Sequence, residues 1–313
     1  MATQDTIHNI FQVRSRARAR HVIKLAVDEL SREWKNTLHH QPLVDELVPA
    51  RIVTLLEVFA RGWIEQLIDH GAPFLERAAE LKLDLKFDYR IAATLHGGTI
   101  TLGQLVAHTI STSRLEAIKS VFDKLIDDDI FNCLARVSNR WDAEVNGKPL
   151  LPIIPDIDQL KRSLFKLFEV RNILVHELPK MKPISADDVN TFLQSATLFI
   201  EATEEYLSQL LHGQYPLTQR AMNEEAIARS DEALLELLEL CVQIAKDYGA
   251  WGAELAAVQA KWNEFRIAEA EWRSNEARGG SMQPMLYALA SEELARSRIK
   301  DLREWVERGK ADV

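Results

Sequence analysis

Cysteine is scarce in this chain. Only Cys133 and Cys241 occur among 313 residues, far apart and at none of the short spacings that zinc ligands share. This argues against a structural metal site and against a disulfide framework. The first residues also lack the apolar core of a secretory signal peptide. These absences favour a cytoplasmic protein whose thiols stay reduced.

Long apolar runs and several catalytic motifs are missing as well. The longest stretch without Lys, Arg, Asp or Glu, residues 91–113, contains His96, Gly97, Gly98 and several hydroxyls, so no membrane span is expected. No HExxH, HxxEH, paired CxxC or Walker pattern occurs, so we expect no metal and no cofactor. Basic residues are not in excess, and the net charge of −9 argues against broad nonspecific binding to nucleic acid.

The remaining composition suits helices. The chain is 47% hydrophobic and 27% charged, with 12 Gly and 10 Pro, as in one or two compact domains. Gly213 and Pro216 interrupt the helical pattern. We therefore predict an all-α fold, with a helical bundle at residues 1–215 and a three-helix domain at residues 216–313.

Three helices of the first domain have recognisable ends. One is predicted to begin at Pro49 and to stop at Gly71. Another begins near Asp156, and a third follows Ser185, which forms a capping-box pattern with Asp188. The first carries apolar residues at helical spacing, namely Ile52, Leu56, Phe59, Trp63 and Leu67.

One segment alternates between apolar and charged side chains instead. This period of two predicts a half-buried strand. A single strand does not make a sheet, so we expect a small extended or hairpin insertion in the bundle, with residues 98–102 as the candidate partner. The apolar members are Leu81, Leu83, Leu85, Phe87 and Tyr89, and the charged ones are Lys82, Asp84, Lys86, Asp88 and Arg90.

The most informative short motif is the string from Arg171 to His176. A guanidinium holds phosphate oxygens bidentately and stays charged at any working pH. An imidazole, with an unperturbed pKa of about 6.5, can accept and return a proton. Asn172 follows the arginine directly, so the string is R-N-x3-H. These groups are suited to cutting RNA.

The string R-N-x3-H resembles the Rx4-6H signature of the HEPN superfamily, whose active members are metal-independent endoribonucleases. The resemblance implies that His176 activates the ribose 2′-hydroxyl or protonates the leaving oxygen, Arg171 stabilises the phosphorane, and Asn172 orients one of them. The products would carry 2′,3′-cyclic phosphate and 5′-hydroxyl ends. It further implies a bacterial toxin–antitoxin or anti-phage role, with Glu57 as a supporting acidic residue.

Helix geometry constrains how this motif can work. Each residue of an α-helix turns by about 100°, so five positions place Arg171 and His176 roughly 140° apart. Either the helix unwinds near Leu178 and Pro179, or two facing copies complete one site. The resemblance favours both, and it implies a homodimer joined through the motif face, with RNA as the ligand.

Plainer interpretations stay open for each of these residues. An arginine and a histidine near a helix end can pair with the helix dipole, which would leave a non-catalytic HEPN scaffold or an antitoxin-like module that binds a protein. Glu57 can be a surface glutamate. An alternating basic band near the N-terminus is either an RNA-backbone contact or a solvated helix face. Its members are Arg14, Arg16, Arg18 and Arg20.

The second domain carries an apolar seam at alternating four- and three-residue steps. We expect this seam to be buried against neighbouring helices, because large apolar side chains left in water forgo roughly 1.5 to 3 kcal/mol each. Its members are Trp251, Leu255, Val258, Trp262, Phe265 and Trp272.

The residues around the seam resemble the domain named after the lysozyme inhibitor LprI. They occur in the family's order as MNxxA, QxxWxxFR, GGSMxP and LxxxRxxxL, and comprise Met222, Asn223, Ala226, Gln259, Trp262, Phe265, Arg266, Gly279, Gly280, Ser281, Met282, Pro284, Leu294, Arg298 and Leu302. We expect Arg266 and Arg298 to pair with acidic side chains or helix ends inside the domain.

One departure from this family is informative. Exported relatives carry cysteines at three places that here hold Glu225, Ala270 and Ala290. A cytoplasmic domain would lose such disulfides without penalty, because thiols stay reduced there. The domain is therefore interpreted as a recognition or regulatory module that binds a protein partner or trigger.

Overall fold

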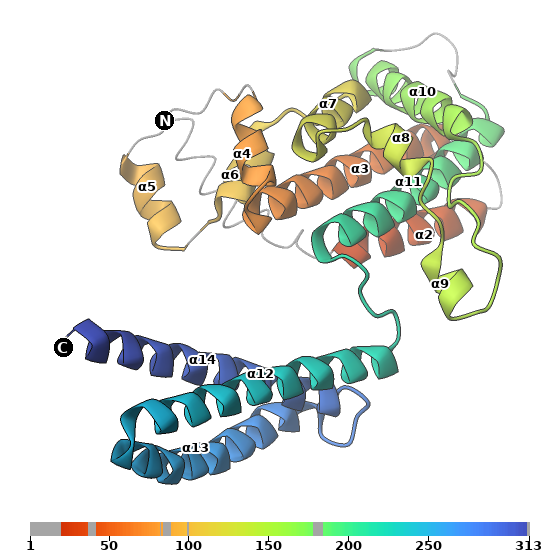
Figure 1. The fold of residues 1–313 in the computed structure, drawn as a ribbon. Helices are drawn as coiled ribbons and strands as arrows, with labels where there is room; N and C mark the ends of the chain where they lie inside the picture. The colour runs from red at the N-terminus through yellow and green to blue at the C-terminus, as the bar shows by residue number, and fades with distance from the viewer. Residues whose placement is uncertain are drawn as a thin grey trace. The chain divides into compact units, whose positions relative to one another are not determined.

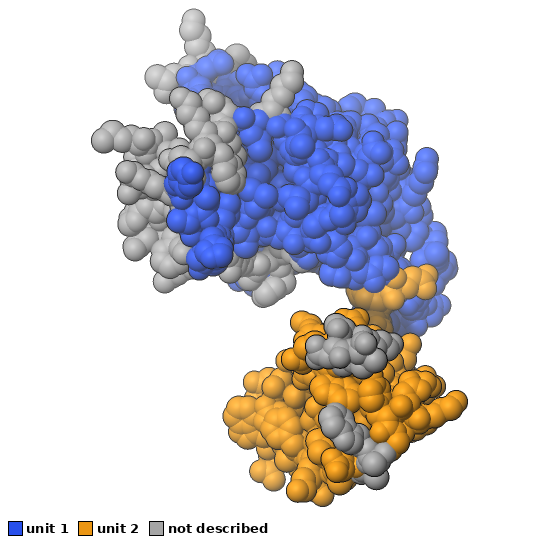
Figure 2. Space-filling view, turned by 60° about the vertical axis from the view of Figure 1, so that its left-hand side comes forward, with its two compact units in different colours: residues 1–213 blue, residues 214–313 orange. Residues whose placement is uncertain are grey.

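The computed structural model describes residues 20–36, 42–81, 83, 89–98, 100–177 and 184–311. The chain divides into two compact units, residues 1–213 and 214–313 (Figure 2). The described residues form helices and no strand, so the predicted all-α fold is confirmed. None of these helices is long and apolar enough to cross a membrane.

Helix α3 is the centre of unit 1. α2, α6, α10 and α11 all pack against it (Figure 1). Val53, Leu56, Phe59 and Trp63 are fully buried on α3, and a helix that is apolar on most sides belongs in a core. In chain order the unit contains α2 (Arg20–Asn36), α3 (Pro42–His70), α4 (Phe74–Arg77), η3 (Ala78–Glu80), α5 (Tyr89–His96), α6 (Leu102–Thr109), α7 (Leu115–Ile126), α8 (Ile130–Leu134), α9 (Arg140–Glu144), α10 (Ile157–His176) and α11 (Ala186–His212).

The predicted start of α3 is wrong. The helix begins at Pro42, and Pro49 lies inside it. A proline within a helix removes one backbone hydrogen bond. Val48 and Ile52 on either side are nevertheless buried in the same core, so tertiary packing outweighs the local cost. Gly71, with φ +95°, follows the last residue of α3 as expected.

The starts of α10 and α11 are confirmed. The Asp156 carboxylate accepts a hydrogen bond from the backbone N–H of Gln159 at 2.9 Å, which caps α10. The Ser185 hydroxyl accepts from the N–H of Asp188 at 3.2 Å, and the Asp188 carboxylate accepts from the N–H of Ser185 at 3.0 Å. This reciprocal pair is the capping box at the start of α11.

The expected hairpin insertion is wrong in the part of this segment that the structure describes. Tyr89 begins α5 instead of ending a strand. Residues 98–102 form no partner strand, because Thr101 caps α6 through a capping box with Gln104. Leu81 is buried and Leu83 packs against the core, whereas residues 82 and 84–88 lie outside the described residues. Leu81 is therefore buried because its side chain packs into the helical core directly after η3, and not because it belongs to a sheet.

Gly103 marks the closest approach of α6 to α3. Its N–H donates to the Asp69 carboxylate at 2.8 Å, and a Cβ added here would lie 2.3 Å from the carbonyl oxygen of Glu65. We expect Gly103→Ala to destabilise unit 1 by about 1–3 kcal/mol, since backbone must move. Loss of amide protection in α6 by hydrogen exchange measures this. Gly147→Ala is the comparison, because Gly147 has φ +65° but no atom lies within 4 Å of an added Cβ. An equal loss of stability in Gly147→Ala would contradict the proposed clash at Gly103.

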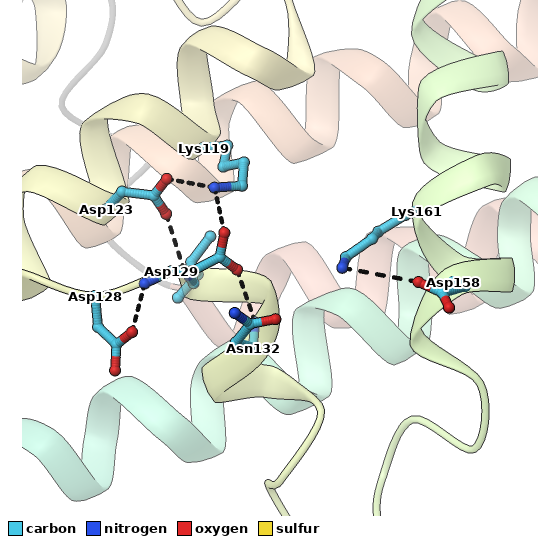
Figure 3. A network of polar contacts seen from close by, with 8 residues as sticks. Lys119, Asp123, Asp128, Asp129, Asn132, Asp158 and Lys161 are labelled. Atoms are coloured by element: carbon cyan, nitrogen blue, oxygen red, sulfur yellow. Dashed lines mark hydrogen bonds and ion pairs between the residues drawn. The ribbon is translucent and has the colours of Figure 1, made fainter.

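A lysine ties α7 to the start of α8. The Lys119 ammonium contacts the carboxylates of Asp123 and Asp129, the latter at 2.6 Å (Figure 3). The Asp123 carboxylate also accepts from the N–H of Ile130 at 2.9 Å, and the Asp129 carboxylate accepts from the N–H of Asn132 at 2.8 Å. Burial alone would lower the pKa of Lys119, but the hydrogen bonds that its ammonium donates to both carboxylates raise it. The corner therefore depends on ionised aspartates.

Acid should weaken this corner. The hydrogen bond from Lys119 lowers the pKa of Asp129 below its ordinary value of 3.8. Its contribution to stability is present above the unfolded-state pKa and is lost as the pH falls through the lower folded-state pKa. We expect Asp129→Asn to cost about 0.5 kcal/mol at pH 7, because the pair is partly exposed. In urea titrations the difference from wild type should shrink below pH ~3.8; a constant difference would contradict the assignment.

Unit 2 is a three-helix domain, as predicted. It contains α12 (Gln219–Tyr248), α13 (Ala250–Ser274), η4 (Asn275–Ala277) and α14 (Gln283–Ala311), and α14 packs along both other helices (Figure 1). Small buried side chains let these helices approach closely, namely Ala226, Ser230, Ala233, Ala270, Ser274, Ala288, Ser291 and Ala295. Larger apolar residues gather towards the other end in a cluster that includes Leu237, Ile244, Ile299 and Leu302.

The prediction that the α13 seam is buried is wrong for half of its members. Val258, Phe265 and Trp272 are 52%, 54% and 69% exposed. Leu255 and Trp262 are partly buried against the apolar cluster, and the side chain of Trp251 lies outside the described residues. The physical reason near the end of α13 is that the helix turns Ala270 and Ser274 inward, where they allow a closer helix contact than Phe265 and Trp272 would. Periodicity identified the helix but not its buried face.

The two family arginines of unit 2 do not pair with carboxylates as expected. The guanidinium of Arg266 is buried and donates to the Ser291 hydroxyl at 2.5 Å and to the Asn263 side-chain oxygen at 2.9 and 3.0 Å. Arg298 donates to the Gln259 side-chain oxygen at 3.4 Å. The Ser230 hydroxyl extends the first group by donating to Ser291 at 2.9 Å. Neutral oxygens inside the bundle therefore satisfy these cations.

Candidate active site

The candidate site lies where α10 crosses α3. Arg171 is on the α10 face that packs towards α3, and its guanidinium lies 3.9 Å from the Glu57 carboxylate. The same guanidinium donates to the side-chain oxygen of Asn172 at 3.1 Å. The predicted residues Arg171, Asn172 and Glu57 therefore come together in one chain. Glu57 is not a surface glutamate, because its side chain is only 13% exposed.

Arg61 is the residue that sequence reasoning missed. It lies one turn after Glu57 on α3, and its guanidinium is 3.6 Å from the second oxygen of the same carboxylate. The i, i+4 spacing of Glu57 and Arg61 was the available signal. Two guanidiniums thus share one carboxylate at this crossing.

His176 is not part of this group. It is the last residue of α10 and is exposed. Within the part of the chain that the structure describes, it makes no hydrogen bond or ion pair. The helix stays regular to this point, since the N–H of Glu177 donates to the carbonyl of Ile173 at 2.9 Å. Arg171 and His176 therefore stay roughly 140° apart in one chain.

Two basic side chains of α10 are paired, whereas Arg162 on the same helix is exposed. Lys166 contacts Asp188 at 2.6 Å, and Lys161 lies 3.9 Å from Asp158. Lys180 and Lys182 fall outside the described residues. So do Arg14, Arg16 and Arg18 of the alternating band, and the side chain of Arg20. No cluster of side chains that could hold a metal occurs among the described residues.

Burial governs the ionisation of Glu57. It raises the pKa of this carboxyl above 4.5, although Arg61 and Arg171 act in the opposite direction. A carboxyl with a raised folded-state pKa binds more protons when folded, so its charge costs stability as the pH rises above the unfolded-state pKa. The two arginine contacts therefore do not fully compensate for the burial of this charge.

Replacing Glu57 with glutamine should accordingly be tolerated. We expect Glu57→Gln to be at least as stable as wild type at pH 7, since the change removes a buried charge and the amide oxygen can still accept from one of the two arginines. Urea denaturation between pH 4.5 and 7 measures this, and Glu201→Gln, which breaks the pair with Lys24 at 2.7 Å, is the control. A large loss of stability for Glu57→Gln alone would show that its charge stabilises the crossing.

Comparison with known proteins bears on the second unit. A family model described as lysozyme inhibitor LprI matches residues 213–302. These residues are similar to the LprI family. The match spans α12, α13 and most of α14, so the resemblance of this part of the chain is confirmed. No curated protein and no solved structure matches the chain, and no comparison supports a HEPN domain in unit 1.

The three places where the resemblance implies cysteines in exported relatives all lie in unit 2. Ala270 and Ala290 are both buried in the three-helix domain, and Glu225 forms an ion pair with Arg229 on the same helix. Small apolar side chains thus occupy two of these places inside the bundle. Cys133 and Cys241, the two cysteines of the chain, are both free.

Proposed function

We propose that unit 1 is a metal-independent HEPN endoribonuclease that acts in the cytoplasm, in a bacterial toxin–antitoxin or anti-phage setting. The observation that supports this most is the position of the Arg171 guanidinium on α10, which contacts Glu57 of α3 and the neighbouring Asn172. A positioned guanidinium can stabilise the charge that develops on a phosphorane during RNA cleavage.

The chemistry requires a histidine beside that guanidinium. Because Arg171 and His176 lie on different faces of α10, the histidine would come from a second copy of the chain, in a homodimer joined through the motif face. His176 of one copy would then accept the proton of a ribose 2′-hydroxyl or protonate the leaving 5′-oxygen. The 2′-oxygen attacks phosphorus, the bond to the 5′-oxygen breaks, and a 2′,3′-cyclic phosphate and a 5′-hydroxyl remain.

The experiment is cleavage of labelled RNA by the purified full chain in excess EDTA. We expect cleavage to persist without metal, and the products to be resistant to 5′-phosphate-dependent exonuclease until a kinase adds a 5′-phosphate. A strict requirement for Mg²⁺, or products with 5′-phosphates, would overturn the proposal.

A second candidate function is a non-catalytic HEPN scaffold that binds a protein. It is favoured by the pairing of Lys166 with Asp188 and of Arg171 with Glu57, which leaves little cationic surface on α10 for RNA. In both cases unit 2 would be the recognition or regulatory module. The name of the LprI family, lysozyme inhibitor, supports a protein as the partner of unit 2, although the absent cysteines distinguish this domain from exported relatives.

A further inference from the structure

α12 and α13 part from each other to form an apolar groove within unit 2. The cavity has a volume of about 530 Å³. Leu234, Leu238 and Val242 line it from α12, and Leu255, Ala260 and Trp262 line it from α13. We call this cavity the α12–α13 groove. A concave apolar surface of this size matches the space that one face of a helix fills in helix-in-groove recognition.

The α12 wall of the groove is open to solvent. Leu238 and Val242 of this wall are 59% and 61% exposed, and Leu235, which lies beside the wall at helical spacing, is 61% exposed. Three large apolar side chains gathered on one exposed stripe are unusual for the surface of a monomeric protein. Such a stripe marks a surface that a partner covers.

Unpaired carboxylates border the groove. Asp231 and Glu239 lie one turn before and one turn after Leu235 on α12, and Glu264 lies one turn after Ala260 on α13. All three are exposed, and none forms an ion pair among the described residues. Lys246 is the basic side chain one turn beyond Val242, so the rim keeps a negative excess. Unit 2 as a whole has 18 acidic and 13 basic residues.

Some carboxylates elsewhere on these helices are matched. Glu236 pairs with Arg303 at 2.8 Å and lies 3.9 Å from Arg296. Glu269 pairs with Arg273 at 2.8 Å. The bundle thus supplies arginines for Glu236 and Glu269, whereas Asp231, Glu239 and Glu264 beside the groove form no ion pair among the described residues. A partner can supply the missing positive charge.

We propose that the α12–α13 groove binds a basic amphipathic helix of a partner protein. The apolar face of that helix fills the groove, and lysine or arginine side chains on its flanks pair with Asp231, Glu239 and Glu264. A second copy of this chain fits less well, because it would bring the same acidic rims face to face. This inference does not depend on the proposed nuclease activity, which concerns unit 1.

The test uses the full chain and a labelled 14-residue peptide with leucines on one helical face and lysines on the other. A matched peptide carries glutamate in place of every lysine. By fluorescence anisotropy, we expect the lysine peptide to bind at least 10-fold more tightly than the glutamate peptide, with affinity falling as salt is raised. Equal binding of both peptides would overturn the charge argument.

Two protein variants locate the site. Leu238→Glu places a charge on the groove wall and should weaken binding of the lysine peptide at least 10-fold. Leu289→Glu on α14, at a residue that is 36% exposed and does not line the groove, should leave binding unchanged. Circular dichroism checks that both variants keep their helices. Equal loss in the two variants, or none in Leu238→Glu, would overturn the proposal.

Charge reversal completes the design. Glu239→Lys combined with Glu264→Lys should reverse the preference, so that the glutamate peptide binds more tightly. Analytical sedimentation of the wild type tests whether a second copy of the chain fills the groove instead. A dimer that Leu238→Glu dissociates, together with no binding of either peptide, would assign the groove to a second copy and overturn the proposal.

Discussion

His176→Ala should lower the rate of RNA cleavage by about 10²- to 10⁴-fold, the usual cost of losing a positioned general acid or base. Arg171→Ala should lose a comparable amount, since a missing donor to a developing charge costs about 10²–10³-fold. Neither change should unfold unit 1, because His176 is exposed and Arg171 is only partly buried. Single-turnover cleavage of a labelled RNA measures both.

The same variants test whether the site is shared between copies. In a heterodimer of Arg171→Ala and His176→Ala chains, one cleft would receive both intact residues and the other neither. Random pairing makes about half of the dimers mixed, so an equimolar mixture should recover roughly a quarter of wild-type activity. His96→Ala, an exposed histidine on α5, is the control and should leave the rate unchanged. A mixture as inactive as its components would show that each cleft belongs to one chain.

Phe59→Ala should be the most destabilising single change in unit 1. Phe59 is fully buried on α3, and its ring meets Phe199 of α11 edge to face with centroids 6.4 Å apart. Truncating a buried phenylalanine costs about 3–5 kcal/mol, against a total stability of about 5–15 kcal/mol for a typical domain. Hydrogen exchange of the α3 and α11 amides follows unit 1 without interference from unit 2.

Phe165→Ala is the matched control. Phe165 lies on α10 and is 39% exposed, so its truncation should cost about 1 kcal/mol or less. If Phe59→Ala left the protection of α3 amides at the wild-type level, the packing of α3 against α11 would not be what stabilises the bundle. Because α10 and α11 both pack on α3, the loss of packing in Phe59→Ala should also move Arg171 away from Glu57.

The sequence determined the class of fold and many helix ends, because those depend on local chemistry. Asp156 and Ser185 cap their helices with their own side chains, and Gly71 and Gly213 end helices at positive φ. The string of LprI residues likewise identified the second unit without any structure. The capping side chains and the glycines act within a few residues of the helix ends that they determine.

Tertiary structure decided which faces and which partners those helices have. The alternating run at 81–90 predicts a strand, yet Tyr89 begins a helix and the expected partner segment caps α6 instead. Glu57 is buried because α10 packs on α3 and places Arg171 beside the Glu57 carboxylate. Arg61 contacts the same carboxylate.

The same limit explains the seam of α13. Sequence spacing marked Phe265 and Trp272 as core, but the helix buries Ala270 and Ser274 instead. A helical period shows which residues share a face, whereas the buried face is chosen by how closely neighbouring helices can approach, and small side chains on α12 and α14 favour the small side of α13. Packing free energy depends on residues far apart in the chain, and no local pattern contains it.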